Sequence, residues 1–277
     1  MEILFHKMHG LGNDFMLLDC RTSPFNLTEA QMRALGDRKT GVGFDQLLVI
    51  EDSAAPGAHA RYRIFNQDGS PAEHCGNGVR CVGKFLHESL ATHPQKIVVE
   101  IAEQTFELAI LDGGDVRVDM GPPILDPVAI PSAFERRDLK YALEVGGEQR
   151  VLGAVSMGNP HAVFEVGDVD SAPVETIGKA LQNCAVFPQQ VNVGFMQNTG
   201  RNSIRLRVWE RGVGETRACG TGACAAVVVG RLWGELDEAV TVSLTGGDLH
   251  IDWTGIDTDP VWMTGRASYV FEGRMTI

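Results

Sequence analysis

The chain has 277 residues, of which 44% are hydrophobic and 22% are charged, so it is long enough for two domains or one large one and too apolar to be disordered throughout. Its net charge of −12 argues against nucleic acid or an anionic membrane as a partner, because clustered Lys and Arg bind phosphates. A small anionic substrate remains compatible with this charge, since a few local donors can hold it.

The compartment is indicated by the first residues and by the cysteines. No apolar stretch approaches the roughly 18–20 residues of a membrane span, and the opening MEILFHKMHGLGNDF lacks the pattern of a secretory signal. A disulfide framework is therefore not expected. We expect a cytoplasmic protein with free thiols at Cys20, Cys75, Cys81, Cys184, Cys219 and Cys224.

The predicted elements alternate between strands and a few helices. Helices are predicted over Thr28–Asp37, Gly76–Leu90, Pro173–Gln182 and Gly220–Leu232, and the first opens on a Thr-Glu-Ala-Gln capping box. Period-two alternation predicts strands at IVVEIA, TFELAIL, DVRVDM, SIRLRVW, AVTVSL and DLHIDW. The second and fourth helices are apolar on most sides, which predicts that both are buried.

Landmarks recur in the same order in the two halves of the chain. Cys75-Gly-Asn-Gly and Cys219-Gly-Thr-Gly lie 144 residues apart, and each precedes one of the apolar helices. Gly12-Asn13 and Gly158-Asn159 lie 146 residues apart, as do Gln46 and Asn192. Chance explains one such pair, but an ordered series predicts a duplication.

The segment Met120-Gly-Pro-Pro123 interrupts both strand and helix patterns and marks the expected boundary. We therefore expect one domain over residues 1–120 and a second over residues 121–263. Each is expected to be a curved, largely antiparallel sheet wrapped around its apolar helix. Two such halves normally pack about a pseudo-twofold axis, which predicts an active site in the cleft between them with Cys75 opposite Cys219.

A cysteine before a glycine-rich helix start has a specific chemical use. The first backbone N–H groups of a helix are unpaired and carry partial positive charge, so a substrate carboxylate can bind there without a lysine. The same field is expected to lower the pKa of the thiol. Two such sulfurs suit a two-base racemase, in which thiolate and thiol serve opposite faces of one carbon.

Other readings stay open from the residues alone. The cysteines could be ordinary core residues. A zinc site lacks suitable ligand spacing, and a thiol–disulfide oxidoreductase would need CxxC. A cysteine acyl-transferase could use His161, which could equally be a core histidine. A binding protein without activity is the alternative outside enzymes, although it would not need the cysteine pair.

Four segments together resemble the diaminopimelate epimerases: MHGLGNDF, FNQDGSPAEHCGNGVRC, MGNPHAVF and WERGVGETRACGTGACA. The resemblance implies an α+β (α/β) fold of two pseudo-symmetric domains, each a mixed, mostly antiparallel β-sheet or barrel around a central helix. It places the C-terminal segment, residues 264–277, back on the first domain. The implied reaction is cofactor-independent conversion of LL- to meso-diaminopimelate in lysine and peptidoglycan synthesis.

The resemblance also implies roles for single residues. Cys75 and Cys219 match the two bases, and His161 and Glu210 match positions that tune the thiols. The implied substrate-binding residues are Asn13, Gln46, Asn66, Gly76, Asn77, Asn159, Asn192, Glu210, Arg211, Gly220 and Thr221. Arg211 can hold the distal carboxylate bidentately, although Glu210-Arg211 could also form a surface ion pair.

The resemblance further implies a homodimer, and it implies neither a metal nor another cofactor. Phe271 stands where the family has a dimer-interface tyrosine, which removes a phenol hydrogen bond from that contact. The six lysines show no context typical of a pyridoxal Schiff base.

Overall fold

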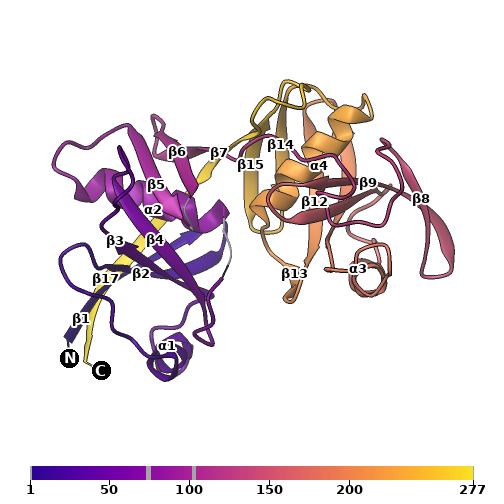
Figure 1. Cartoon of the computed structure of the whole chain (residues 1–277). Helices are drawn as coiled ribbons and strands as arrows, with labels where there is room; N and C mark the ends of the chain where they lie inside the picture. The colour runs from indigo at the N-terminus through magenta and orange to yellow at the C-terminus, as the bar shows by residue number, and fades with distance from the viewer. Residues whose placement is uncertain (1, 73–75, 102–103, 277) are drawn as a thin grey trace. The chain divides into compact units, whose positions relative to one another are not determined.

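The computed structural model describes residues 2–72, 76–101 and 104–276, which form two compact units (Figure 1). Unit 1 comprises residues up to Val118 together with the segment from Gly265 onward, and unit 2 runs from Asp119 to Thr264. No helix in these described ranges is long and apolar enough to cross a membrane. Cys75, one of the two predicted bases, lies outside the described residues.

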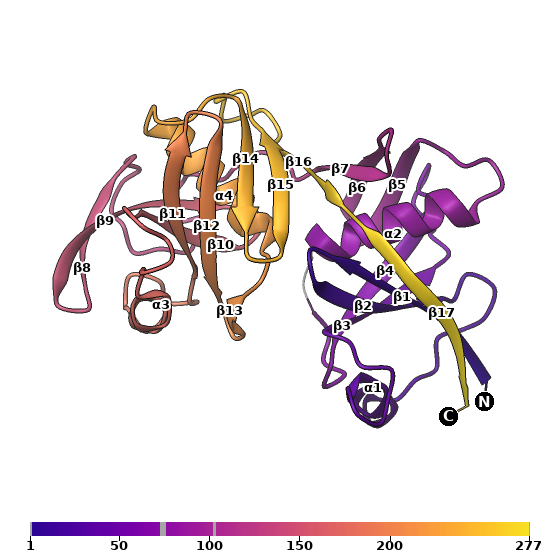
Figure 2. The same cartoon turned by 180° about the vertical axis from the view of Figure 1, so that it is seen from behind.

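The described residues of unit 1 form eight strands, paired in the order β17-β1-β2-β3-β4-β5-β6-β7. Their bounds are β1 Glu2–Gly10, β2 Asn13–Asp19, β3 Gln46–Glu51, β4 Ala60–Asn66, β5 Lys96–Ile101, β6 Gln104–Ile110, β7 Asp115–Asp119 and β17 Ser268–Thr276. Only β2–β3 and β4–β5 among these pairs are parallel. Figure 2 shows β17, in yellow, beside β1, so the last strand of the chain lies against the first.

Unit 2 repeats this order as β8-β9-β10-β11-β12-β14-β15-β16, again with two parallel pairs, β10–β11 and β12–β14. The bounds are β8 Tyr141–Val145, β9 Glu148–Ser156, β10 Pro160–Glu165, β11 Asn192–Gly200, β12 Ser203–Glu210, β14 Ala239–Leu244, β15 Gly247–Asp252 and β16 Trp262–Arg266. A short strand, β13 (Gly214–Thr216), adds a hairpin to β12.

The strand registers confirm the duplication residue by residue. Phe15 pairs with Gln46 across β2–β3, and His161 pairs with Asn192 across β10–β11, which is the same pair moved by 146 residues. The predicted fold class, a mixed and mostly antiparallel sheet repeated in two halves, is therefore confirmed.

Each sheet is packed against one apolar helix, as predicted. Helix α2 (Gly76–Ser89) contacts β1, β2, β3, β5 and β6, and helix α4 (Gly220–Leu232) contacts β9–β12, β14 and β15. Figure 2 shows α2 within unit 1 and α4 behind the strands of unit 2. Every residue of α4 from Gly220 to Gly230 is buried, because its small and branched side chains face strands on most sides.

The two shorter helices also occur where the sequence predicts them. Helix α1 (Glu29–Gly36) begins at the predicted capping box, in which the Thr28 hydroxyl accepts from the Gln31 N–H and the Gln31 side chain accepts from the Thr28 N–H. Helix α3 (Val174–Gln182) follows Pro173 and buries Ile177 and Leu181 in the core of unit 2.

Candidate active site

The candidate residues lie at the ends of elements, and in each unit they gather at one edge of the sheet. In unit 1, β2 and β3 begin with Asn13 and Gln46, and the antiparallel β4 ends with Asn66. In unit 2, Asn159 precedes β10, β11 begins with Asn192 and β12 ends with Glu210. Parallel neighbours start at the same edge and an antiparallel one ends there, so the topology itself collects these polar side chains.

Two equivalent glycines shape the approach to the asparagines. Gly12 and Gly158 have φ of +83° and +88°, a conformation that other residues adopt at a cost. Each immediately precedes its asparagine, Asn13 or Asn159. A glycine in this conformation therefore precedes the asparagine in both units.

Cys219 caps the N-terminus of α4 with an extended backbone, φ −123° and ψ 109°. Its side chain is 4% exposed, and its Sγ lies 3.6 Å from the Thr221 hydroxyl. A Cβ added at Gly222 would come within 3.2 Å of this sulfur, so the glycine keeps space beside it. The helix start therefore offers a thiol, a hydroxyl and unpaired N–H groups in one place.

A carboxylate faces this thiol directly. The Cys219 Sγ donates to Glu210 Oε2 at 3.1 Å, and the Thr216 hydroxyl donates to Glu210 Oε1. The β12–β13 hairpin, in which Glu210 pairs with Gly214, brings the two donors to one side chain. Glu210 is thus placed to accept the proton of Cys219.

Burial raises the pKa of the Cys219 thiol well above its usual value, and the negative charge of Glu210 raises it further. Hydrogen bonds from Thr221 and from the backbone of Gly222 act in the opposite direction but do not prevail. The prediction of a lowered thiol pKa at this helix start is therefore wrong for Cys219. Desolvation of a thiolate outweighs the field of the helix end, and Cys219 rests as a thiol.

His161 is 1% exposed, and its Nε2 lies 2.9 Å from Asn159 Oδ1. Burial lowers the pKa of His161 to about 3, and the nearby charge of Arg211 lowers it as well. The imidazole is consequently neutral at neutral pH, and the hydrogen bond indicates that Nε2 carries the proton.

Asn192 organises the turn that carries Arg211. Its Oδ1 accepts the Arg211 backbone N–H at 2.8 Å, and its Nδ2 donates to the Pro160 carbonyl at 3.3 Å. The Arg211 guanidinium donates to the carbonyl of Gln189 at 3.2 Å. A buried amide thus fixes the backbone from which a partly exposed cation extends.

Unit 1 brings its candidate amides together as two pairs. Gln46 Nε2 donates to Asn66 Oδ1 at 3.3 Å, and Asn77 Nδ2 donates to Asn13 Oδ1 at 3.3 Å. Asn77 is the second residue of α2, directly after Gly76. The start of α2 therefore carries an amide cluster beside backbone N–H groups that can bind an anion.

Three residues at these sites were missed in the sequence. Thr216 bonds Glu210, Asp45 bonds Asn13, and Arg80 bonds Asn77. Arg80 carried a usable signal, since a charged residue in a helix expected to be buried must find partners there. Within the described residues, no group of His, Cys, Asp and Glu is arranged to hold a metal ion.

Comparison with known proteins identifies relatives over the whole chain. The family model described as diaminopimelate epimerase matches residues 5–125 and 153–270. The diaminopimelate epimerase of Stutzerimonas stutzeri is 50% identical over 277 residues, and that of Alkalilimnicola ehrlichii is 52% identical over 279 residues, with 100% of both chains covered in each case. That of Paraburkholderia xenovorans is 50% identical, covering 100% of this chain and 99% of its own.

Solved structures share the fold at low sequence identity. A probable proline racemase from Agrobacterium radiobacter aligns with a TM-score of 0.71 and 16% identity over 99% of this chain and 93% of its own. A hydroxyproline epimerase from Agrobacterium vitis aligns with a TM-score of 0.69 and 15% identity over 99% and 92%.

Proposed function

Because this chain belongs to the diaminopimelate epimerase family, we propose that its reaction is carried out by two thiols, Cys75 and Cys219, acting on opposite faces of one α-carbon. The protein is an isomerase that converts LL-2,6-diaminopimelate into the meso form, a step of lysine and peptidoglycan biosynthesis. In each direction one sulfur removes the α-proton as a thiolate and the other delivers a proton as a thiol. The roles exchange when the direction reverses.

The hydrogen bond between Cys219 and Glu210 is the observation that carries this proposal. A buried thiol that donates to a carboxylate can deliver its proton to a carbanion. It can also become a base when Glu210 receives its proton. Burial keeps the imidazole of His161 neutral. His161 is proposed to adjust the pKa of the thiols without adding a positive charge.

The α-carboxylate of the substrate is proposed to bind the two helix starts. Gly76 and Asn77 begin α2, and Gly220 and Thr221 begin α4. In the proposed complex, unpaired N–H groups of a helix start stabilise the negative charge that grows on the carboxylate as the α-proton leaves, which favours an enolate-like intermediate. We therefore propose a reaction that needs no metal and no other cofactor.

The distal carboxylate of the substrate is proposed to pair with Arg211. The amides of Asn66, Asn159 and Asn192 are proposed to aid this contact. The remaining polar side chains of the proposed site are those of Asn13, Gln46 and Glu210.

We expect Arg211→Met to raise KM for diaminopimelate about 10- to 150-fold, because a charge-assisted hydrogen bond contributes about 1.5–3 kcal/mol. Arg205→Met is the matched control, since Arg205 pairs with Asp170 on an exposed part of the same unit. Equal Michaelis constants for the two variants would place Arg211 outside the site.

A homodimer through β1 and β17 is supported by exposed apolar side chains on this strand pair. Leu4, Tyr269, Val270 and Phe271 are 38–53% exposed, and Phe5 packs edge to face on Phe271 with ring centroids 6.0 Å apart.

We expect Phe271→Glu to yield a monomer in light scattering, because a buried unpaired charge would oppose association. Val128→Glu, at an 85% exposed apolar residue of unit 2, is the control. A Phe271→Glu dimer as tight as the wild type would exclude this surface.

Incubation of the purified protein with LL-diaminopimelate, followed by chiral separation, tests the function. We expect an equilibrium mixture with the meso form, without added pyridoxal phosphate and in the presence of a chelator. Activity that requires added pyridoxal phosphate, or that is lost in the presence of the chelator, would contradict the proposal.

A cytoplasmic location is also proposed, in line with the free thiols among the described cysteines.

A further inference from the structure

The amide of Asn13 is fixed at both of its ends. Its Nδ2 donates to Asp45 Oδ2 at 3.0 Å, and its Oδ1 accepts from Asn77 Nδ2 at 3.3 Å. An ionised carboxylate only accepts hydrogen bonds, so the NH₂ group of Asn13 must face Asp45. The carbonyl of Asn13 must therefore face Asn77, and the flipped amide would lose both bonds.

The second amide is fixed in the same way by a cation. Arg80 Nη2 donates to Asn77 Oδ1 at 2.7 Å, and Arg80 Nη1 donates to the Gly76 carbonyl at 3.1 Å. A guanidinium only donates, so the carbonyl of Asn77 faces Arg80 and its NH₂ group faces Asn13. The absence of a side chain at Gly10 makes room for this contact, because a Cβ there would lie 3.2 Å from Arg80 Nη2.

The four groups form a hydrogen-bond chain with one direction. Donation runs from Arg80 to Asn77, from Asn77 to Asn13, and from Asn13 to Asp45. A fully buried cation stands at one end and a carboxylate at the other. Each bond in such a chain polarises the next, so the orientation of both amides is cooperative.

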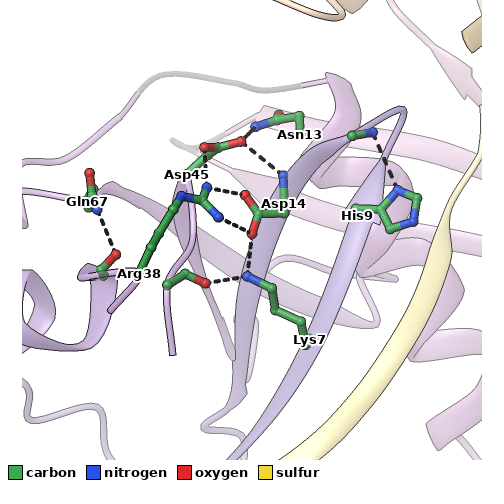
Figure 3. A network of polar contacts seen from close by, with 10 residues as sticks. Lys7, His9, Asn13, Asp14, Arg38, Asp45 and Gln67 are labelled. Atoms are coloured by element: carbon green, nitrogen blue, oxygen red, sulfur yellow. Dashed lines mark hydrogen bonds and ion pairs between the residues drawn. The ribbon is translucent and has the colours of Figure 1, made fainter. Parts of the chain in front are cut away.

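Asp45 is itself held in place by charged neighbours (Figure 3). Arg38 Nη2 lies 2.7 Å from Asp45 Oδ1 and 2.6 Å from Asp14 Oδ1, and the Asp14 N–H donates to Asp45 Oδ2 at 3.1 Å. Burial opposes ionisation of Asp14, but hydrogen bonds from Arg38 and Lys7 outweigh it and lower its pKa to about 2. Asp14 is therefore ionised at neutral pH, and the Arg38 guanidinium bonds to both carboxylates.

Unit 2 has no counterpart to this chain at the equivalent positions. With the offsets of the duplication, Val191 stands in place of Asp45 and Cys224 in place of Arg80, and both are fully buried. Asn159 bonds the imidazole of His161 instead of a carboxylate. The chain is thus a feature of unit 1 that the duplicated fold does not require.

We propose that Asp45 is a positioning residue for the reaction, which fixes the amides of Asn13 and Asn77 in the single orientation in which they bind substrate. The inference rests on the proposed function, in which both amides contact diaminopimelate. Asp45 touches no substrate and acts only through Asn13. Its side chain is 45% exposed, so its replacement leaves the core of unit 1 intact.

We expect Asp45→Ala to lower kcat/KM for diaminopimelate about 10- to 100-fold, because a displacement of about 1 Å in a binding group can cost that much. Asp45→Asn keeps an oxygen acceptor for Asn13 and should recover part of this loss. Glu51→Ala is the matched control, since Glu51 ends the strand that follows Asp45 and is also paired with arginines, Arg61 and Arg63. It should retain wild-type kinetics.

A double-mutant cycle with Asn13→Ala separates positioning from general stability. If Asp45 acts through Asn13, Asp45→Ala costs little further activity once Asn13 is alanine. Losses that multiply, or an Asp45→Ala enzyme that matches Glu51→Ala, would overturn the inference. Should Asp45→Ala fail to fold, Asp45→Asn in the same cycle decides the question. A wild-type protein that does not convert diaminopimelate would instead refute the proposed function.

Discussion

Cys75→Ala and Cys219→Ala are each expected to abolish epimerisation, lowering kcat/KM by about 10⁴-fold or to the limit of detection. Each sulfur serves one face of the α-carbon, so the remaining thiol can exchange a proton on its own face but cannot invert the centre. The enzyme does not alter the equilibrium between the isomers, and kcat/KM must therefore fall equally in both directions. Chiral separation of the isomers, with either one as the starting substrate, measures this.

Cys81→Ala and Cys224→Ala are the controls for the cysteine variants. Both thiols are fully buried inside helices, where alanine removes packing but no reacting group. These variants should retain most of the activity, with a lower thermal midpoint. A Cys75→Ala or Cys219→Ala enzyme that inverts diaminopimelate at the wild-type rate would refute the two-base mechanism.

Glu210→Gln is expected to change two properties in opposite directions. Burial and the charge of Glu210 both raise the pKa of the Cys219 thiol. Because the variant removes this charge, the thiol should ionise at lower pH. Turnover should nevertheless fall about 10²- to 10⁴-fold, because the amide cannot accept the proton of Cys219. The pH dependence of Cys219 alkylation, followed by peptide mass, reports the first change, and steady-state kinetics reports the second.

Glu215→Gln provides the control for this variant. Glu215 lies on the same hairpin, but its carboxylate pairs with Arg207. Its replacement should leave both the alkylation profile and turnover near the wild type. If Glu210→Gln and Glu215→Gln behave alike, the 3.1 Å contact between Cys219 and Glu210 has no part in proton transfer.

The fold was predictable because local and long-range signals agree. Both central helices begin at the first glycine of the Cys-Gly-x-Gly motif, Gly76 or Gly220, and their largely apolar character requires burial on several sides. The repeated landmarks predicted a repeated architecture, which the pairing of Phe15 with Gln46 and of His161 with Asn192 confirms.

The electrostatics of the site could not be read from the sequence in the same way. The sequence places Cys219 at a helix start, which favours a thiolate, but it does not show that the β12–β13 hairpin folds Glu210 onto the sulfur. The direction of the pKa change depends on that contact and on complete burial. Asp45 was missed for a related reason, since a carboxylate before a strand usually faces solvent, and only the structure places Asn13 against it.

Solvent deuterium is the most direct test of the two-base mechanism. LL-diaminopimelate is incubated with the enzyme in deuterated water, and substrate and product are separated and analysed by mass at early conversion. The two-base mechanism predicts one deuterium at the inverted carbon of the meso product and unlabelled remaining substrate, because the proton that leaves and the deuteron that arrives belong to different sulfurs. Deuterium appearing in the remaining substrate as fast as in the product would show that one base serves both faces, and it would contradict the two-base mechanism.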